Sequence, residues 1–245
     1  MKYRKLSFII PVYNEERTLE QLLAKVAAAE LDIEKEIVLV DDGLRDRSPE
    51  ILQKLSKQPG YKVLFNENNS GKSQTVKRGI LASTGDLVVI QDADLEYDPE
   101  DLDEFVQTFQ LTDVDVIYGN RFGKANKVVY WHNWIGNTGL SYFSAFITGL
   151  RAGMWTRDME VCYKMARGEV YRDIAKKLTS RSTFGLEPEL TALFSKYKIA
   201  GRHLQFRQIP ICYYPRTLAE GKHMSAINDG IKAGWEIIKF NFLKH

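Results

Sequence analysis

The stretch Leu87-Val-Val-Ile-Gln-Asp-Ala-Asp94 is a short apolar run that ends in two aspartates separated by one alanine. Gly85-Asp86 precedes it and Asp98-Pro99 follows it, and a run this short between turn residues favours a buried strand over a helix. Alternate side chains of a strand share one face, so we expect Asp92 and Asp94 to point the same way at its carboxyl end. Open α/β sheets bind ligands at that end, where paired carboxylates suit Mg²⁺ or Mn²⁺ carried in with substrate phosphates. The alternative is a pair that only begins a solvated loop.

Strand and helix patterns alternate through the first half of the chain. Strands are predicted at residues 6–12, 36–40, 61–65, 87–90 and 114–118, and helices at 18–29, 48–57, 73–83 and 99–109. After residue 121 the pattern changes to an uncharged stretch, helices at 170–178 and 188–196, and a last strand at 209–214. The alternation predicts an α/β fold: a Rossmann-like, mostly parallel sheet flanked by helices, with a C-terminal helical extension.

The composition is that of a soluble protein with a sizeable core. The chain has 245 residues, of which 44% are hydrophobic and 27% charged, and this length suits one large domain or a domain with a helical appendage. A formal charge of +2 gives no electrostatic reason to expect nucleic acid as a partner. Cys162 and Cys212 have no metal-binding spacing and suggest no disulfide framework, so a reducing cytoplasm is expected.

Two segments in the second half are candidates for lipid contact. Residues 128–150 carry no Asp, Glu, Lys or Arg, but their Asn, Ser, Thr and His side chains are too polar for a membrane-spanning helix. An interfacial or groove-lining helix is expected there. The tail, residues 225–243, places one apolar stripe along a helix, made of Ile227, Ile231, Gly234, Trp235, Ile238 and Phe242. Either this stripe packs on the domain or the tail is a membrane-surface helix.

Acidic groups follow three of the predicted strands. Glu15 and Glu16 come after the first, Asp41 and Asp42 after the second, and the Asp92-Ala93-Asp94 pair after the fourth. Strand ends of a parallel sheet meet at one edge, where one carboxylate can hold a base or ribose and another a metal on a pyrophosphate.

The loop before residue 73 resembles part of a phosphate-binding loop. Gly71-Lys72-Ser73 matches the end of that motif, but Asn66 stands where the motif requires its first glycine, so we exclude a nucleoside triphosphatase. Lys72 is still expected to approach a phosphate, because its loop opens a helix whose N-terminus favours anions.

Further blocks occur in a recognisable order along nearly the whole chain. They are Ile10-Pro-Val-Tyr-Asn-Glu15, Val40-Asp-Asp-Gly43, Asn69-Ser-Gly-Lys72, Gly85-Asp86, Gln91 to Pro99, Gly119-Asn-Arg-Phe122, Asp158 to Lys164, Phe184 to Glu189, Tyr213 to Thr217 and Glu220-Gly-Lys222. Together these blocks resemble the family 2 glycosyltransferases of the GT-A fold, and within them the dolichol-phosphate mannosyltransferase-like branch that acts on polyprenyl phosphates.

The resemblance implies a site and a division of the chain. A nucleotide sugar would be held by Pro11, Tyr13, Glu15, Asp42, Lys72, Gln91 and Asp92, and Mg²⁺ or Mn²⁺ by Asp92 and Asp94. Residues 1–222 would form the glycosyltransferase domain, with a nucleotide-sugar half (1–122) and an acceptor half (123–222), and residues 223–245 an amphipathic helix.

The chain departs from the family pattern at two places. Leu44-Arg45-Asp46-Arg47-Ser48 replaces the usual Ser-x-Asp-Gly-Thr, and Ser73 replaces the last glycine of Gly-Lys-Gly. Both changes border the nucleotide pocket, so the base and the donor sugar stay open.

The resemblance implies an inverting transfer of a hexose, mannose or glucose, from a GDP-mannose or UDP-glucose type donor to a dolichyl or undecaprenyl type phosphate. A lipid phosphate is already anionic and needs no base, so Arg121, Arg216 and Lys222 would position it, while Asp94 serves the leaving group. A hydroxyl acceptor would instead need a carboxylate base, with Asp158 the first candidate and Glu160 behind it.

Two other interpretations remain at this stage: a soluble family 2 transferase that acts on a hydroxyl, and a catalytically degenerate nucleotide-binding module. The sequence contains no spanning segment after the domain, so membrane contact is expected to be peripheral, at the cytoplasmic face. A homodimer is compatible with the sequence.

Overall fold

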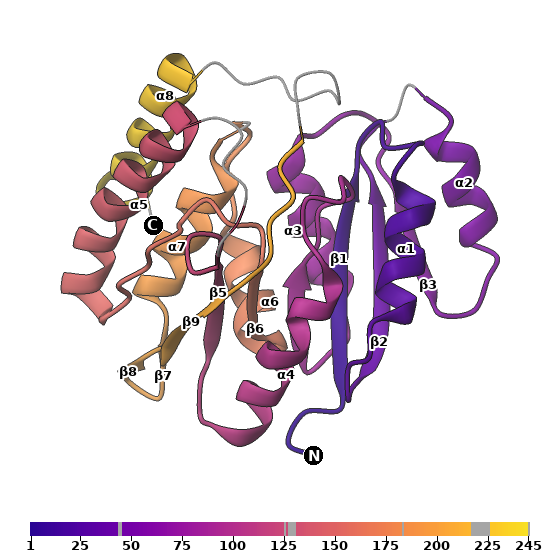
Figure 1. Cartoon of the computed structure of the whole chain (residues 1–245), viewed down its shortest axis with the longest axis horizontal. Coiled ribbons are helices and arrows are strands. Elements are labelled where there is room, and N and C mark those ends of the chain that lie inside the picture. Colours follow the sequence, from indigo (N-terminus) through magenta and orange to yellow (C-terminus); the bar gives the residue numbers. More distant parts are fainter. Residues whose placement is uncertain (44–45, 125, 127–130, 183, 217–225, 245) are drawn as a thin grey trace.

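A computed structural model describes residues 1–43, 46–124, 126, 131–182, 184–216 and 226–244. Within this part of the chain, the centre of the fold is a seven-stranded sheet in the order β3-β2-β1-β4-β6-β5-β9 (Figure 1). The strands are β1 (Lys5–Val12), β2 (Glu34–Asp41), β3 (Tyr61–Phe65), β4 (Leu87–Ile90), β5 (Val116–Asn120), β6 (Lys164–Arg167) and β9 (Phe206–Pro210). β6 runs antiparallel to β4 and β5, and the other pairs are parallel. The predicted mostly parallel α/β sheet is confirmed.

Helices cover both faces of the sheet (Figure 1). They are α1 (Leu19–Ala28), α2 (Ser48–Leu55), α3 (Lys72–Ala82), α4 (Leu102–Leu111), α5 (Trp131–Ala152), α6 (Gly168–Lys177), α7 (Leu186–Lys196) and α8 (Ala226–Ile238), with a 3-10 turn at Pro99–Asp101 and a π-helical turn at Lys239–Leu243. α3 packs on β1 and β2 and contacts α6, and α5 and α8 lie side by side beyond α7.

The central position of β4 explains its unbroken apolar sequence. Its four residues are at most 2% exposed, because helices cover both faces of the strand. β4 lies between β1 and β6, so the Asp92-Ala93-Asp94 turn emerges in the middle of the sheet edge. The fold thereby places the acidic pair beside the ends of β1 and β2.

The strands of the second half differ from the sequence prediction, which placed a single strand there. β9 ends at Pro210, whereas the predicted strand ran from 209 to 214. After Pro210 the chain crosses the strand ends, because the backbone N–H groups of Cys212 and Tyr214 donate to Asp101 and to the carbonyl of Glu96, outside the sheet. β6 was not predicted at all. Its Lys164 is buried, with Nζ 5.0 Å from the centre of the Tyr118 ring. A charged residue in so short a segment does not indicate a buried strand in the sequence.

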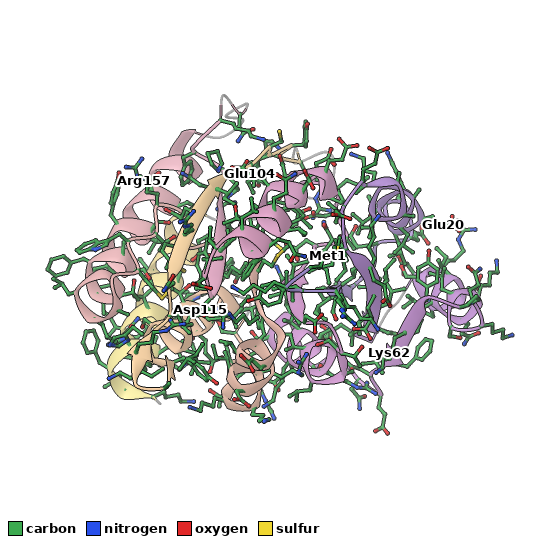
Figure 2. All side chains as sticks on the ribbon, turned by 90° about the horizontal axis from the view of Figure 1, so that it is seen from below. Met1, Glu20, Lys62, Glu104, Asp115 and Arg157 are labelled. Carbon is green, nitrogen blue, oxygen red and sulfur yellow. The ribbon has the colours of Figure 1, made fainter. Side chains whose placement is uncertain are left out.

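An ion cluster closes the opposite edge of the sheet. Asp115, which Figure 2 labels, immediately precedes β5 and is fully buried. Its carboxylate pairs with Arg167 of β6 at 3.0 Å. Arg202, in the short β8 strand (Arg202–His203) that pairs with β7 (Lys198–Ile199), contacts the same carboxylate. These charges lie at the end of the sheet away from the acidic turns, so they stabilise the fold and not the site.

The tail helix docks with a different face from the one that the sequence stripe suggests. Ala233, Ile237 and Phe240 are buried against the domain, while Trp235 and Phe242 of the predicted stripe are more than half exposed. Of the helices that the structure describes, none combines the length and the apolar character that a membrane span requires. Over residues 131–150, the described part of the stretch 128–150, this agrees with the prediction that the stretch does not span a membrane.

Candidate active site

Acidic side chains from the ends of β1 and β4 meet around one guanidinium. Arg216 Nη2 lies 3.0 Å from Asp94 Oδ2, and its Nη1 lies 3.4 Å from Glu15 Oε1. Asp94 follows β4, Glu15 follows β1, and Arg216 comes from the segment that crosses the strand ends after β9. The structure therefore brings three of the predicted site residues together.

The turn after β4 adds a further carboxylate. The backbone N–H of Glu96 donates to Asp94 Oδ1 at 3.1 Å, and Leu95 between them has a φ of 62°, in the left-handed region that a branched side chain disfavours. Such strained backbone clusters at functional sites. The turn brings Glu96 within 4.0 Å of Arg216 Nε, so Asp94 and Glu96 face the same cation.

A second cation holds the other aspartate of the pair. Lys72 Nζ lies 2.9 Å from Asp92 Oδ1 and 3.4 Å from Glu187 Oε1. Burial alone would lower the pKa of Lys72, but Asp92 and Glu187 raise this pKa well above its usual value. Lys72 is therefore a permanent cation that ties the first residue of α3 to the β4 turn and to α7.

The electrostatics of Asp94 show an excess of negative charge. Burial, together with the charges of Asp92 and Glu96, raises the pKa of Asp94 to about 7, although Arg216 acts in the opposite direction. A carboxyl whose neighbours resist its ionisation gains from any added cation.

The donors present fit a hard divalent cation. Within the described residues, no three His, Cys, Asp or Glu side chains form a ready metal site. Mg²⁺ that arrives with substrate phosphates, however, needs only one or two protein carboxylates and keeps other oxygen ligands. Asp92 and Asp94 supply two such carboxylates, and the guanidinium of Arg216 already shows that a cation is held there.

Asp42 organises the neighbouring part of the edge. Its Oδ1 accepts hydrogen bonds from the backbone N–H of Ser70 at 2.8 Å and from the Ser70 hydroxyl at 3.1 Å. Gly43 has a φ of 76°, and a Cβ there would lie 2.5 Å from the backbone nitrogen of Asn69, so only glycine allows the two loops to approach this closely. Tyr13, which follows β1, is 47% exposed, and Pro11 within β1 is half-buried.

Asp46 lies in the stretch 44–48, where the sequence departs from the family pattern, and it connects two elements of the fold. Leu44 and Arg45 lie outside the described residues, but Asp46 is described. Its carboxylate accepts hydrogen bonds from the backbone N–H groups of Glu16 at 3.0 Å and Ser48 at 2.9 Å. Asp46 thus joins the end of β1 to the start of α2.

Arg121 and Asp158 form a closed buried pair. Asp158 accepts hydrogen bonds from Arg121 Nε at 2.8 Å, from Nη2 at 2.7 Å and from the backbone N–H at 3.0 Å, and its side chain is fully buried. The guanidinium carbon lies 5.0 Å from the centre of the Tyr213 ring. Both oxygens of Asp158 are engaged, so in this arrangement the residue positions Arg121; its predicted role as a base stays a prediction.

Glu160 has one carboxylate oxygen that is buried without a hydrogen-bond partner among the described residues. Burial and the charge of Glu187 raise the pKa of Glu160 to about 8. A buried oxygen without a hydrogen bond lowers the free energy of unfolding, so we expect Glu160 to be protonated or to accept a hydrogen bond from a bound ligand.

Gln91, another predicted residue, lies outside the acidic cluster. Gln91 is fully buried, with Oε1 accepting from the Tyr163 hydroxyl at 2.6 Å and Nε2 donating to the backbone carbonyl of Asp92 at 3.0 Å, so its amide supports the turn from below. Lys222 lies outside the described residues. Sequence reasoning missed the contacts of Glu96 and Glu187, although both residues stand in the quoted blocks and only their acidic character could have signalled them.

Comparison with known proteins connects this geometry to a family. Residues 7–174 match the family described as glycosyl transferase family 2. A stretch of 127 residues is 37% identical to the dolichol-phosphate mannosyltransferase of Pyrococcus furiosus and covers 52% of this chain and 36% of that protein. A stretch of 133 residues is 38% identical to the undecaprenyl-phosphate 4-deoxy-4-formamido-L-arabinose transferase of Pseudomonas aeruginosa and covers 53% of this chain and 38% of that protein. The chain thus spans well under half the length of these curated relatives.

Solved structures agree on the fold. Glucosyl-3-phosphoglycerate synthase from Mycobacterium tuberculosis, in complex with Mn²⁺, UDP and phosphoglyceric acid, superposes with a TM-score of 0.65 at 18% identity, covering 99% of this chain and 80% of that chain. Another structure of that synthase gives a TM-score of 0.68 at 16% identity, over 99% of this chain and 82% of the other. At such identities the likeness shows a shared GT-A-like fold.

Proposed function

This chain belongs to glycosyl transferase family 2, and on that premise we propose that it transfers a hexose from a nucleoside diphosphate sugar to a polyprenyl phosphate. The observation that carries the proposal is the acidic pair at the end of the central strand, where Asp92 and Asp94 already hold Lys72 and Arg216. Two carboxylates flanked by two cations suit a divalent ion together with the phosphates of a donor.

The donor would lie along the ends of β1, β2 and β4. Tyr13 offers an exposed ring for contact with the base, and Asp42 shapes the adjoining loop. A bound Mg²⁺ or Mn²⁺ would supply a Lewis acid that offsets the charge developing on the departing nucleoside diphosphate. Support for this cofactor comes from the synthase that shares the fold, which was solved with UDP and either ion.

The reaction would be a single displacement with inversion. An acceptor oxygen forms a new bond to the anomeric carbon while the bond from that carbon to the donor phosphate oxygen breaks, and the electron pair leaves with the nucleoside diphosphate. A phosphate acceptor is already anionic near neutral pH and requires no base. The engagement of both Asp158 oxygens by Arg121 therefore favours a phosphate over a hydroxyl acceptor.

A hydroxyl acceptor is the second candidate, and one observation supports it. The carboxylate oxygen Oε1 of Glu160 is buried and has no hydrogen-bond partner among the described residues. With a pKa raised to about 8, chiefly by burial, Glu160 could take a proton from an alcohol if it lost its own first.

An exposed apolar face supports work at a membrane. The side chains that form it are Tyr142, Phe143, Phe146 and Leu150 of α5, Ile231, Trp235 and Ile238 of α8, and Phe242 and Leu243 of the π-helical turn. Over the described residues 136–152 and 230–244, the acidic side chain is Glu236, which is buried and paired with Lys239 at 2.7 Å. Exposed apolar side chains gathered on two helices in contact mark an interaction site, and these suit a bilayer surface. We propose peripheral attachment at the cytoplasmic face, where a polyprenyl phosphate would be reached.

The test is transfer in vitro to an acceptor panel. The protein is incubated with Mn²⁺, a series of GDP- and UDP-hexoses, and either undecaprenyl or dolichyl phosphate in vesicles or a set of sugar alcohols and glycosides. We expect a labelled lipid product with at least one donor, and none with Asp94→Ala. Transfer to hydroxyl acceptors alone would contradict the lipid assignment and favour the Glu160 alternative.

A further inference from the structure

The guanidinium of Arg216 contacts Asp94, one of the two carboxylates proposed to hold a metal ion. It lies 3.0 Å from Asp94, 3.4 Å from Glu15 and 4.0 Å from Glu96, so three carboxylates share one monovalent cation. Its buried Nε has no hydrogen-bond partner among the described residues. The side chain is thus held by charge, with part of its hydrogen-bonding capacity unused.

Glu96 fastens the backbone that carries Arg216. The Arg216 N–H donates to Glu96 Oε1 at 2.9 Å, the Tyr213 hydroxyl donates to Glu96 Oε2 at 2.8 Å, and the Tyr214 N–H donates to the Glu96 carbonyl at 2.9 Å. Residues 213–216, which we call the crossing segment, are therefore anchored to the same turn that presents Asp94. This anchoring keeps the guanidinium within reach of Asp94 even when the two separate.

Lys72 and Arg216 differ in whether each keeps a carboxylate partner when a metal ion binds Asp92 and Asp94. Lys72 has Glu187 as a second partner and is the first residue of α3, so it remains paired if Asp92 turns toward an ion. Arg216 lies in a segment without helix or strand. Asp94 Oδ1 already accepts the Glu96 N–H, which favours Oδ2, the atom that contacts Arg216, as the ligand of Mg²⁺ or Mn²⁺. A divalent ion on Oδ2 repels the nearby guanidinium, so we expect Arg216 to be the group that moves.

We propose that Arg216 is an exchangeable counter-ion of the metal site: it occupies Asp94 in the metal-free protein, yields Asp94 to the ion, and then pairs with the donor diphosphate. The inference rests on the proposed metal role of Asp92 and Asp94. In both states the arginine offsets one negative charge, first of a carboxylate and then of a phosphate, and its planar donors suit either.

A thermodynamic consequence separates this role from simple phosphate binding. The metal alone must displace Arg216 from Asp94 without giving it a new partner, so Mn²⁺ alone binds weakly. A nucleoside diphosphate supplies that partner, so Mn²⁺ and nucleotide strengthen each other's binding, by the same factor in both directions. Phosphate oxygens that bind the ion would also couple Mn²⁺ binding to nucleotide binding. The contribution of Arg216 is the part of this coupling that is lost when Arg216 is replaced.

The experiment measures free Mn²⁺ by electron paramagnetic resonance while the protein is titrated, with and without GDP or UDP. We expect Arg216→Gln to bind Mn²⁺ alone several-fold more tightly than the wild type, and the gain in Mn²⁺ affinity on adding nucleotide to fall several-fold. Arg216→Lys, which keeps the charge, should stay near the wild type for Mn²⁺ alone. Arg207→Gln, an exposed arginine on β9, is the matched control and should change neither quantity.

The outcomes also distinguish this inference from the proposed function. If the wild type binds Mn²⁺ with nucleotide, Asp94→Ala loses that binding, and Arg216→Gln binds Mn²⁺ alone no more tightly than the wild type, the counter-ion role is wrong while the metal site stands. If Asp94→Ala binds Mn²⁺ and nucleotide like the wild type, the metal assignment fails and the inference fails with it. Melting curves of each variant exclude misfolding as the cause.

Discussion

Replacement of Asp158 by asparagine probes whether this residue holds Arg121 or acts on substrate. Asp158 is fully buried and accepts three hydrogen bonds from Arg121, whose side chain is 10% exposed. Asn keeps the shape but removes the charge, so the guanidinium is left buried without a counter-charge. Breaking a buried pair in this way costs about 3–5 kcal/mol.

For a domain of this size, each kcal/mol lowers the melting temperature by roughly 2 °C or more, so Asp158→Asn should lower Tm by about 6 °C at the least. Differential scanning calorimetry and urea unfolding measure the change. Replacing both partners, as Arg121→Met with Asp158→Leu, should recover part of the loss, because the pair then leaves no isolated charge. A Tm within about 1 °C of the wild type in Asp158→Asn, together with loss of transfer, would refute the structural role and restore Asp158 as the base.

Three further perturbations follow from the site and its surroundings. Glu160 has a pKa raised from 4.5 to about 8, so the folded state holds a proton that the unfolded state has lost, and the unfolding free energy should fall as pH rises through this window. Glu160→Gln should remove about 2 kcal/mol of this fall between pH 5.5 and 7.5 in urea unfolding, and a pH profile parallel to that of the wild type would count against it. Trp235→Glu should lose binding to anionic vesicles in a flotation assay, with an unfolding free energy within about 0.5 kcal/mol of the wild type. Leu111→Glu, at an 83% exposed site on α4, should float like the wild type. Equal flotation of both variants would argue against the apolar face. Gly43→Ala should cost about 1–3 kcal/mol of unfolding free energy and weaken nucleotide binding, because its Cβ would meet Asn69 and its φ is left-handed; an unchanged Tm would contradict the tight loop contact.

The strands that carry the acidic turns could be predicted because their signals are local. β4 has the predicted bounds, and β1 and β2 differ from theirs by one or two residues at an end, since each is an apolar run that stops at polar residues. β6 could not be predicted, because its burial depends on Tyr118, which lies 46 positions away from Lys164 in sequence and is needed to shield the charge. Long-range partners of this kind leave no periodic pattern.

The sequence predicted which residues belong to the candidate site better than it predicted which of them pair with one another. Asp92, Asp94 and Lys72 were recognised from motif and position, but the pairing of Asp94 with Arg216 joins residues 122 positions apart. Which face of the tail docks was also beyond the sequence, because Ala233 and Ile237 of α8 and Phe240 of the π-helical turn, which are buried, are apolar like the stripe left outside. In such cases the partner surface decides, and it is built from other parts of the chain.

The central claim is that Asp92 and Asp94 anchor a metal and the diphosphate of a nucleotide sugar. Isothermal titration calorimetry of the protein with GDP-mannose and UDP-glucose, with and without Mn²⁺, tests it most directly. We predict that at least one of these nucleotide sugars binds in the presence of Mn²⁺, that binding weakens at least tenfold without the ion, and that Asp94→Asn removes this dependence. Binding of neither donor, or equal binding with and without Mn²⁺, would contradict the account.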